Sequence, residues 1–403
     1  MQVHKILCEK QSQEIPHQFI LLGDMATKVH LLVALVALLV ACHLLLNQLC
    51  ASIRSLLLWA LLPLGTPGQE CWSPSEVALG RNYTMHTLSN AESKDLTTAD
   101  GRRIDSVWAT PRGYRRENRR AVILLHGNQM NLDGLVESAE IYLGWGVCTL
   151  LVTFGGYPTP DPHAPVYFPD ELTMYLDAEA ALEFLVTVEH IPATNVLVHG
   201  LSAGGGAAHA LGVRHPVLVT ADKTYTSLEE VAAAAVTMAG KGWYFAAEWT
   251  VTRLMLRAVA PAVQALVPWV ARRLVFPRRS TAWPCSQPDG LLNEAKARAK
   301  ATDPSVRAPY FVFYASEDEI MSPDFAPRLI TAGYWLNSPR DAVEHPRLFR
   351  CGPSHSSSWH NRIATRAAYS NELWRAGFLR HRPATEMMRH RRHSGPLALR
   401  VNN

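Results

Sequence analysis

The sequence predicts an α/β fold in which a mostly parallel β-sheet carries helices on both faces. Short apolar runs alternate with helix-like segments between residues 121 and 220, an alternation typical of such sheets. The strand-like runs are residues 121–125, 147–153, 195–198 and 217–220, and the helix-like segments lie near 132–143, near 170–188 and just after 202. A second observation is the glycine-flanked serine that follows the third of these runs.

Four further strand-like runs flank this region. Residues 82–87 and 104–110 alternate in polarity, and Asp100-Gly101 between them is a strong tight-turn signal, so we expect an antiparallel opening hairpin. Residues 310–315 are strongly β-prone, and residues 346–350 form the last candidate strand.

The most informative motif is Gly200-Leu201-Ser202-Ala203-Gly204, which matches G-x-S-x-G. It separates a strand-like run from a segment of small residues that is typical of a helix start. A serine on such a sharp turn is pushed out of the sheet, and the crowded turn requires small residues on both sides. The motif predicts that Ser202 is a nucleophile, and a glycine-rich helix start that binds an anion is the alternative.

A serine nucleophile needs a base within hydrogen-bond reach and a carboxylate that orients the base. With this kind of turn, the order along the chain is serine, acid, histidine. The run 310–315 ends in an acidic loop, in which Asp318 is the expected acid and Glu317 and Glu319 are the alternatives. A solvated loop that caps a helix is the non-catalytic interpretation.

The base is expected after one more strand. Residues 351–357 form a small polar loop with glycine and proline, from which a histidine is free to point back toward Ser202. His355 in this loop is the expected base. His360 is the alternative, although we expect it on the following helix.

The loop His126-Gly127-Asn128 follows the strand-like run 120–125. Acyl transfer requires backbone N–H groups aimed at the negative charge that develops on the substrate oxygen. One N–H is expected from Ala203, directly after the nucleophile, and the other from Asn128. His126 is expected to be a structural hydrogen-bonding residue rather than a catalyst.

With these motifs in this order, the chain resembles the α/β-hydrolase superfamily over about residues 80–380. Residues 221–228 are a further match, similar to the segment after the sixth strand in membrane-anchored esterases and thioesterases. The resemblance implies a mostly parallel eight-stranded α/β-hydrolase sheet. It also favours Asp318, because Ile320-Met321 and the proline after them resemble the loop after the seventh strand of these enzymes.

The implied activity is hydrolysis of carboxylic esters or thioesters, on lipid-like acyl substrates, through a Ser-His-Asp triad and an acyl-enzyme. A peptidase or an acyltransferase on the same triad is the first alternative. A catalytically silent binding or scaffold module is the second, because a fold does not fix a function.

Composition narrows the possible cofactors and partners. The net charge of +4 is too small to indicate nucleic acid as a partner. The seven cysteines are scattered without C-x-x-C spacing, which argues against a disulfide framework and a zinc site. We therefore expect no cofactor and no metal, and the sequence specifies no protein partner.

Residues 31–46 are almost purely apolar, and residues 49–64 resume this character after Asn47-Gln48. About 20 helical residues cross a bilayer core, so residues 31–64 predict a membrane anchor, as a single pass or a hairpin. An apolar hairpin packed on the enzyme is the alternative. Lysines before this segment favour a cytoplasmic N-terminus, and therefore an exported catalytic domain. The unpaired cysteines instead favour a reducing compartment for that domain, so its side of the membrane stays open.

The expected organisation is an N-terminal segment (1–75), a hydrolase domain (76–380) and a basic disordered tail (381–403). Residues 228–307 interrupt the alternation with helix-like and unusually apolar sequence. They lie where hydrolases insert a cap, so we expect a cap that roofs the pocket and forms an acyl-binding groove. Packing in the core is the alternative.

Overall fold

The computed structural model describes residues 73–114, 119–128, 130–161, 171–226, 310–318, 321–336, 348–354 and 356–382 of the 403-residue chain. All of them belong to one compact unit, Leu57–Asn403. The predicted anchor, the cap, His355, Glu319 and the tail beyond residue 382 lie outside the described residues. Within the described ranges, no helix has both the length and the apolar character needed to cross a bilayer.

Eight strands form one sheet in the order β1-β2-β4-β3-β5-β6-β7-β8. The six strands from β3 to β8 run parallel to one another, with β4 on the far side of β3 from β5. The strand β2 is antiparallel to both of its neighbours, β1 and β4. Their bounds are Glu92–Thr97, Arg103–Ala109, Ala121–Leu125, Cys148–Val152, Val196–Leu201, Leu218–Asp222, Tyr310–Ala315 and Leu348–Gly352, from β1 to β8. This confirms the predicted mostly parallel, eight-stranded sheet.

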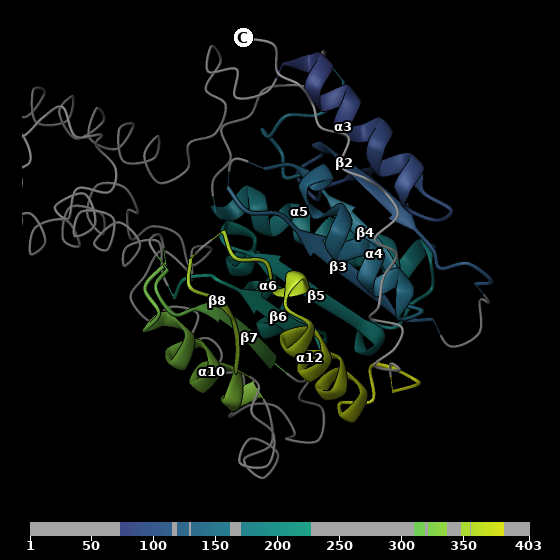
Figure 1. Cartoon of the computed structure of the whole chain (residues 1–403). Helices are drawn as coiled ribbons and strands as arrows, with labels where there is room; N and C mark the ends of the chain where they lie inside the picture. Colours follow the sequence, from purple (N-terminus) through teal and green to yellow (C-terminus); the bar gives the residue numbers. More distant parts are fainter. Residues whose placement is uncertain are drawn as a thin grey trace, which may run out of the picture. The chain divides into compact units, whose positions relative to one another are not determined.

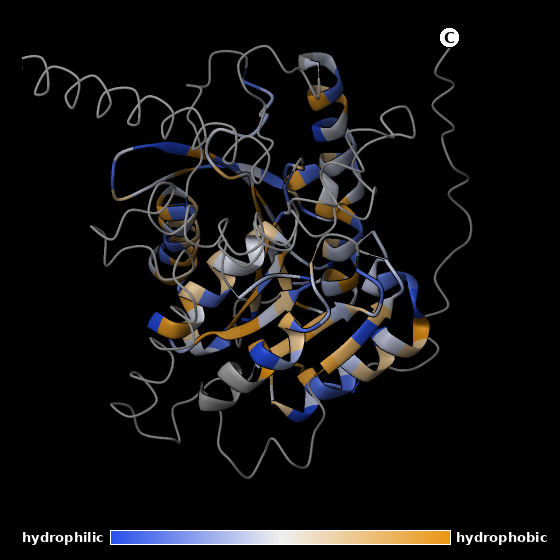
Figure 2. Ribbon diagram, turned by 90° about the vertical axis from the view of Figure 1, so that its left-hand side faces the viewer, coloured by the Kyte–Doolittle hydropathy of each residue, from blue (hydrophilic) through white to orange (hydrophobic). Residues whose placement is uncertain are grey.

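Helices cover both faces of the sheet, as predicted. One buried cluster joins the strands to α5 (Glu171–Glu183), α6 (Ala203–Arg214) and α10 (Phe325–Leu336). A second cluster joins them to α4 (Val136–Gly144) and α12 (Ile363–Arg375), which Figure 1 shows in front of the sheet. The strands between these layers are strongly apolar, as their orange colour in Figure 2 shows, because both of their faces are buried.

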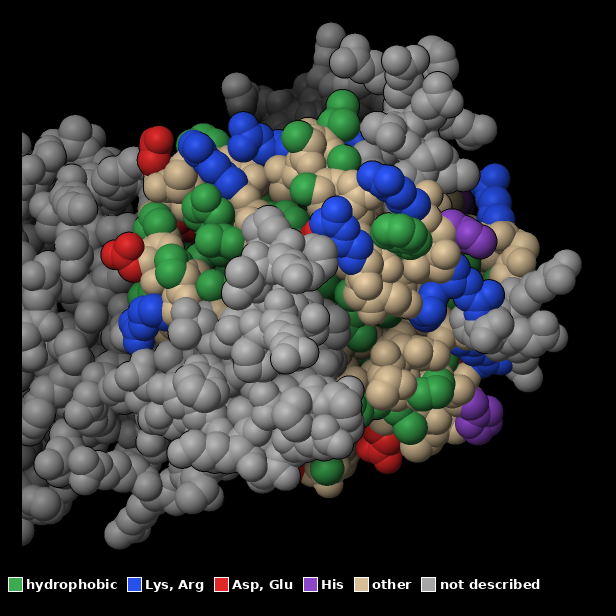
Figure 3. Space-filling view, turned by 90° about the horizontal axis from the view of Figure 1, so that it is seen from below, with side chains coloured by type: hydrophobic (Ala, Val, Ile, Leu, Met, Phe, Trp, Pro, Cys, Tyr) green, Lys and Arg blue, Asp and Glu red, His purple; other side chains and the backbone are tan. Residues whose placement is uncertain are grey.

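Besides the helix α3 (Pro74–Thr87), the remaining regular elements in the described ranges are short. They are the 3₁₀ turns Leu132–Leu135, Ala193–Asn195 and Trp359–Asn361, and the π-helical turn Phe184–Val188 that continues α5. On the face shown in Figure 3, Lys and Arg side chains of the described residues are interspersed with hydrophobic groups and are not gathered into one stripe.

The predicted strand at residues 82–87 is wrong, because these residues belong to the helix α3 (Pro74–Thr87). Ser73 and Glu76 form a capping box at its start: the Glu76 N–H donates to Ser73 Oγ at 3.2 Å, and the Ser73 N–H donates to Glu76 Oε2 at 2.7 Å. Pro74 in the first turn supports the same start. The opening hairpin is instead formed by β1 and β2, with its turn at Asp100-Gly101 as predicted.

A buried arginine in α3 connects this helix to the sheet through hydrogen bonds and ion pairs. The Arg81 guanidinium donates to both carboxylate oxygens of Asp105 in β2, at 2.8 and 2.6 Å. Its Nε donates to Asp133 at 3.1 Å, and the Thr84 hydroxyl donates to the same Asp133 oxygen at 2.6 Å. The planar, bidentate geometry is one that arginine provides and lysine does not.

Candidate active site

Ser202 lies on the turn between β5 and α6, in the strand–turn–helix context that its motif predicted. Its φ is +51°, a left-handed value that residues with a side chain rarely adopt. Such strain persists only where the surrounding structure over-determines it, and it is concentrated at functional sites. We call this turn, residues 200–204, the elbow; its strand–turn–helix geometry is the one that G-x-S-x-G motifs adopt.

Three glycines, which we call the glycine cage (Gly200, Gly204 and Gly205), make this turn possible. A Cβ on Gly200 would overlap the carbonyl group of Gly204, and a Cβ on Gly205 would overlap the Thr224 side chain. A Cβ on Gly204 would lie 2.5 Å from the carbonyl oxygen of Leu125 in β3. Each glycine is thus required by a different neighbour, which explains the pattern of the motif.

The end of β6 and the loop after it form hydrogen bonds with the backbone of the elbow. The Ser202 N–H donates to the Asp222 carbonyl at 2.8 Å, and the Thr224 hydroxyl donates to the Ser202 carbonyl at 2.6 Å. The Tyr225 hydroxyl reaches the Ala203 carbonyl at 3.5 Å. The peptide groups on both sides of Ser202 are therefore held by one loop.

The loop after β3 lies directly beside the serine. A Cβ placed on Gly127 would be 3.3 Å from the Ser202 Cβ. Asn128, the predicted second oxyanion donor, follows in the same loop and is half-buried, and its Oδ1 accepts a hydrogen bond from the Tyr157 hydroxyl at 3.1 Å. Tyr157 comes from the loop after β4 and was not singled out as a site residue from the sequence.

His126 holds this loop in place, as the structural role expected for it requires. Its Nδ1 donates to the Gly127 carbonyl at 2.7 Å, and its Nε2 accepts the Phe154 N–H at 3.1 Å. Complete burial lowers the pKa of His126 to about 4, so the ring is neutral at neutral pH. The two hydrogen bonds fix the tautomer and connect the exits of β3 and β4.

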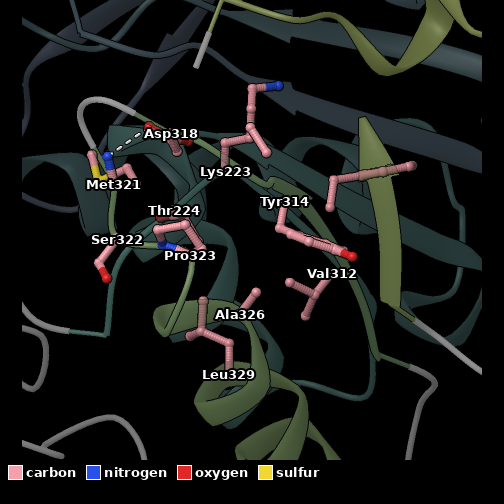
Figure 4. A pocket seen from close by; sticks show the side chains of 12 residues that line it. Lys223, Thr224, Val312, Tyr314, Asp318, Met321, Ser322, Pro323, Ala326 and Leu329 are labelled. Atoms are coloured by element: carbon pink, nitrogen blue, oxygen red, sulfur yellow. Dashed lines mark hydrogen bonds between the residues drawn. The ribbon is translucent and has the colours of Figure 1, made fainter. Parts of the chain in front are cut away.

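Asp318, the expected acid, follows β7 and is buried, whereas its neighbour Glu317 is exposed. The Met321 N–H donates to Asp318 Oδ1 at 2.7 Å. Asp318 lines a small pocket with Thr224, shown in Figure 4, and Ala326 and Leu329 lie at its other end. Thr224 connects this pocket to the elbow, because its hydroxyl binds the Ser202 carbonyl.

The end of β8 and the loop after it run alongside the loop of Asp318 as far as Pro353. The Ser316 N–H donates to the Gly352 carbonyl at 3.0 Å, and the Glu317 N–H donates to the Pro353 carbonyl at 2.7 Å. His355 itself is outside the described residues. The alternative base, His360, lies in the turn Trp359–Asn361, with its Nδ1 3.3 Å from the Glu137 carboxylate of α4.

The structure thus brings together Ser202, Ala203 and the Gly127-Asn128 loop, and Thr224 connects this group to the pocket of Asp318. With the sheet order and the elbow, these features define an α/β-hydrolase fold. Solved structures to which the chain is similar include an α/β hydrolase of Vibrio vulnificus, esterases, another hydrolase and peptidases. No family model matches the sequence.

Three of these solved structures illustrate the similarity. Esterase Pf2001 of Pyrococcus furiosus is 16% identical over 75% of this chain and 94% of that chain, with a TM-score of 0.46. The 2,6-dihydroxy-pseudo-oxynicotine hydrolase is 15% identical over 83% and 80%, with a TM-score of 0.48. A puromycin-hydrolysing peptidase of Mycobacterium tuberculosis is 18% identical over 73% and 40%, with a TM-score of 0.46.

Proposed function

We propose that the protein is a serine hydrolase that cleaves carboxylic esters or thioesters through an acyl-enzyme. The observation that carries the proposal is the elbow, in which Ser202 keeps a φ of +51° inside the glycine cage and beside the Gly127-Asn128 loop. A turn that only capped a helix would not need a strained residue pressed against a second loop.

In the proposed mechanism, Ser202 Oγ attacks the acyl carbonyl carbon while His355 takes the hydroxyl proton. The N–H groups of Ala203 and Asn128 stabilise the oxyanion, and Asp318 orients His355. The tetrahedral intermediate collapses, and His355 transfers the proton to the departing alcohol or thiol. Water, deprotonated by His355, then attacks the acyl-serine, and the carboxylic acid leaves as Ser202 regains its proton.

The proposed substrate is a lipid-like acyl ester or thioester, met at a membrane to which residues 31–64 anchor the enzyme. This part of the proposal is supported by the apolar sequence of residues 31–64 and 228–307. An enzyme anchored at a bilayer would meet acyl chains where they are concentrated.

The first test is labelling of the full-length protein in membrane fractions with a fluorophosphonate, which reacts with activated serines. We expect labelling of the wild type and its loss in Ser202→Ala and His355→Ala. Ser138→Ala, a change at another buried serine on α4, is the matched control and should keep its labelling. His360→Ala tests the alternative base and should also be labelled.

The substrate class is then tested with matched ester, thioester and amide substrates of increasing acyl length. Faster turnover of long-chain esters or thioesters supports the proposal, and cleavage of amides alone would favour the peptidase alternative. A folded wild type that is not labelled at all would contradict the hydrolase proposal and favour a binding module.

A further inference from the structure

Lys223 is an unusual residue next to the elbow. It follows β6 directly, its side chain is 4% exposed, and its φ is +46°, in the left-handed region. A lysine is rarely buried to this extent, and a left-handed conformation normally favours glycine or asparagine. The burial of a charged side chain and the left-handed backbone both cost free energy at this one position, which indicates that the lysine has a role there.

An ion pair holds this side chain. The Lys223 ammonium lies 2.7 Å from Asp222 Oδ1, and the other carboxylate oxygen of Asp222 lies 3.5 Å from His199 Nε2. Burial opposes both charges, but the pairing outweighs it: the pKa of Lys223 lies above its usual value, and the pKa of Asp222 is about 2. The Lys223 N–H also donates to the Phe313 carbonyl at 3.0 Å, which ties the turn to β7.

The residues on either side of Lys223 hold the nucleophile. Asp222 accepts the Ser202 N–H through its carbonyl, and Thr224 donates its hydroxyl to the Ser202 carbonyl. The direction of the chain between these two contacts is set by the left-handed Lys223. In Figure 4 its side chain extends away from Ala326 and Leu329, so its ammonium does not point into the pocket.

We infer that Lys223 is a positioning residue, whose ion pair with Asp222 fixes the turn 222–224 and thereby the orientation of Ser202. The inference rests on the proposed function of Ser202. Without the ammonium, the turn would lose one of the contacts that hold its strained conformation, and the two hydrogen bonds to Ser202 would shift with it. A displacement of the reacting group by about 1 Å is enough to slow a reaction about 100-fold.

The test compares Lys223→Met with the wild type, because methionine keeps an unbranched apolar stem and removes the charge. The rate of fluorophosphonate labelling is measured against probe concentration in the full-length protein, which separates the maximal rate from the half-saturating concentration. We expect a maximal rate lower by about 100-fold, with an unchanged half-saturating concentration and an unchanged pH profile of labelling. Lys94→Met, a change at a half-buried lysine of β1, should behave like the wild type.

A second variant covers the case in which Lys223→Met does not fold. Asp222→Asn combined with Lys223→Met leaves no uncompensated buried charge, and thermal unfolding shows whether it is folded. We expect this variant to be labelled slowly as well, because it also lacks the ion pair. Wild-type labelling by the folded double variant would overturn the inference, as would a change confined to the half-saturating concentration. Failure of the wild type to react would instead overturn the proposed function, and this inference with it.

Discussion

Gly204 shows how closely single residues control the elbow. The packing of α6 on β3 places it against the Leu125 carbonyl oxygen, 2.5 Å from where a methyl group would lie. We predict that Gly204→Ala lowers the free energy of unfolding by about 1–3 kcal/mol, the usual cost of overpacking. It should also abolish fluorophosphonate labelling, because α6 can move away only by carrying Ser202 with it. Urea unfolding and labelling measure the two effects.

Gly144→Ala is the control for this change. Gly144 is the last residue of α4, and a Cβ there meets no atom within 4 Å. The substitution should raise the free energy of unfolding by about 0.4–1 kcal/mol, because alanine restricts the unfolded chain. Equal changes in unfolding free energy and in labelling for the two variants would show that a methyl group fits at Gly204, contrary to this structure.

At the scale of elements, Tyr157 connects the loop after β4 to the loop after β3. Its hydroxyl donates to Asn128 Oδ1 at 3.1 Å, and the residue is 5% exposed. We predict that Tyr157→Phe lowers the free energy of unfolding by only about 1 kcal/mol but slows labelling about tenfold. The reason is that Asn128, the proposed oxyanion donor, loses the contact that orients it. Tyr83→Phe on the exposed side of α3 should change neither quantity.

His126 connects the same two loops, and its burial predicts how the free energy of unfolding depends on pH. The folded protein lowers the pKa of this histidine to about 4, from about 6.5 in the unfolded chain. Between these values the unfolded state binds a proton that the folded state does not, so the free energy of unfolding decreases as the pH falls below 6.5.

His126→Gln removes this titrating group. From pH 7.5 to pH 5.0, the wild type should lose about 2 kcal/mol more stability than the variant, which urea unfolding at both pH values would show. Other histidines contribute equally to both proteins and cancel in the difference. An equal loss would mean that His126 is already protonated, or solvated, in the folded state.

At the scale of the whole domain, Arg81 determines whether α3 belongs to the same cooperative unit as the sheet. Removal of its side chain would leave the partly buried carboxylates of Asp105 and Asp133 without their cation. We predict that Arg81→Ala costs about 3–5 kcal/mol in a single unfolding transition. Arg103→Ala breaks the exposed pair with Asp95 and should cost about 0–1 kcal/mol. A separate early transition of α3 would contradict the prediction.

Most of the sheet could be predicted from the sequence because its central strands are buried on both sides. The run Ala121–Leu125 is apolar throughout, and no competing pattern obscures it. The helix α3 was missed because residues 82–87 alternate in polarity, although Ser73 and Glu76 carried the signal of a capping box. The alternating pattern of residues 82–87 gave the wrong prediction because the structure of this segment is set by a helix start six or more residues earlier.

The candidate site was only partly predictable for a related reason. Ser202 and the loop of Asn128 were found because each has a local motif. Tyr157 reaches Asn128 from the loop after another strand, β4, and nothing in the sequence around it indicates that contact. Lys223 was also missed, because its left-handed backbone depends on its contacts with Asp222 and with β7 rather than on a preference of lysine.

The glycine cage also has a consequence for how this sequence can evolve. Gly200, Gly204 and Gly205 press against α6, β3 and the loop after β6, so no single compensating change elsewhere could make room for side chains at all three. Glycine lowers the intrinsic stability of a helix, but at these positions a larger side chain would cost more through overpacking. The packing of α6, β3 and the loop after β6 therefore keeps these glycines whether or not Ser202 is used. In lineages where that serine has been lost, we expect the three glycines to remain.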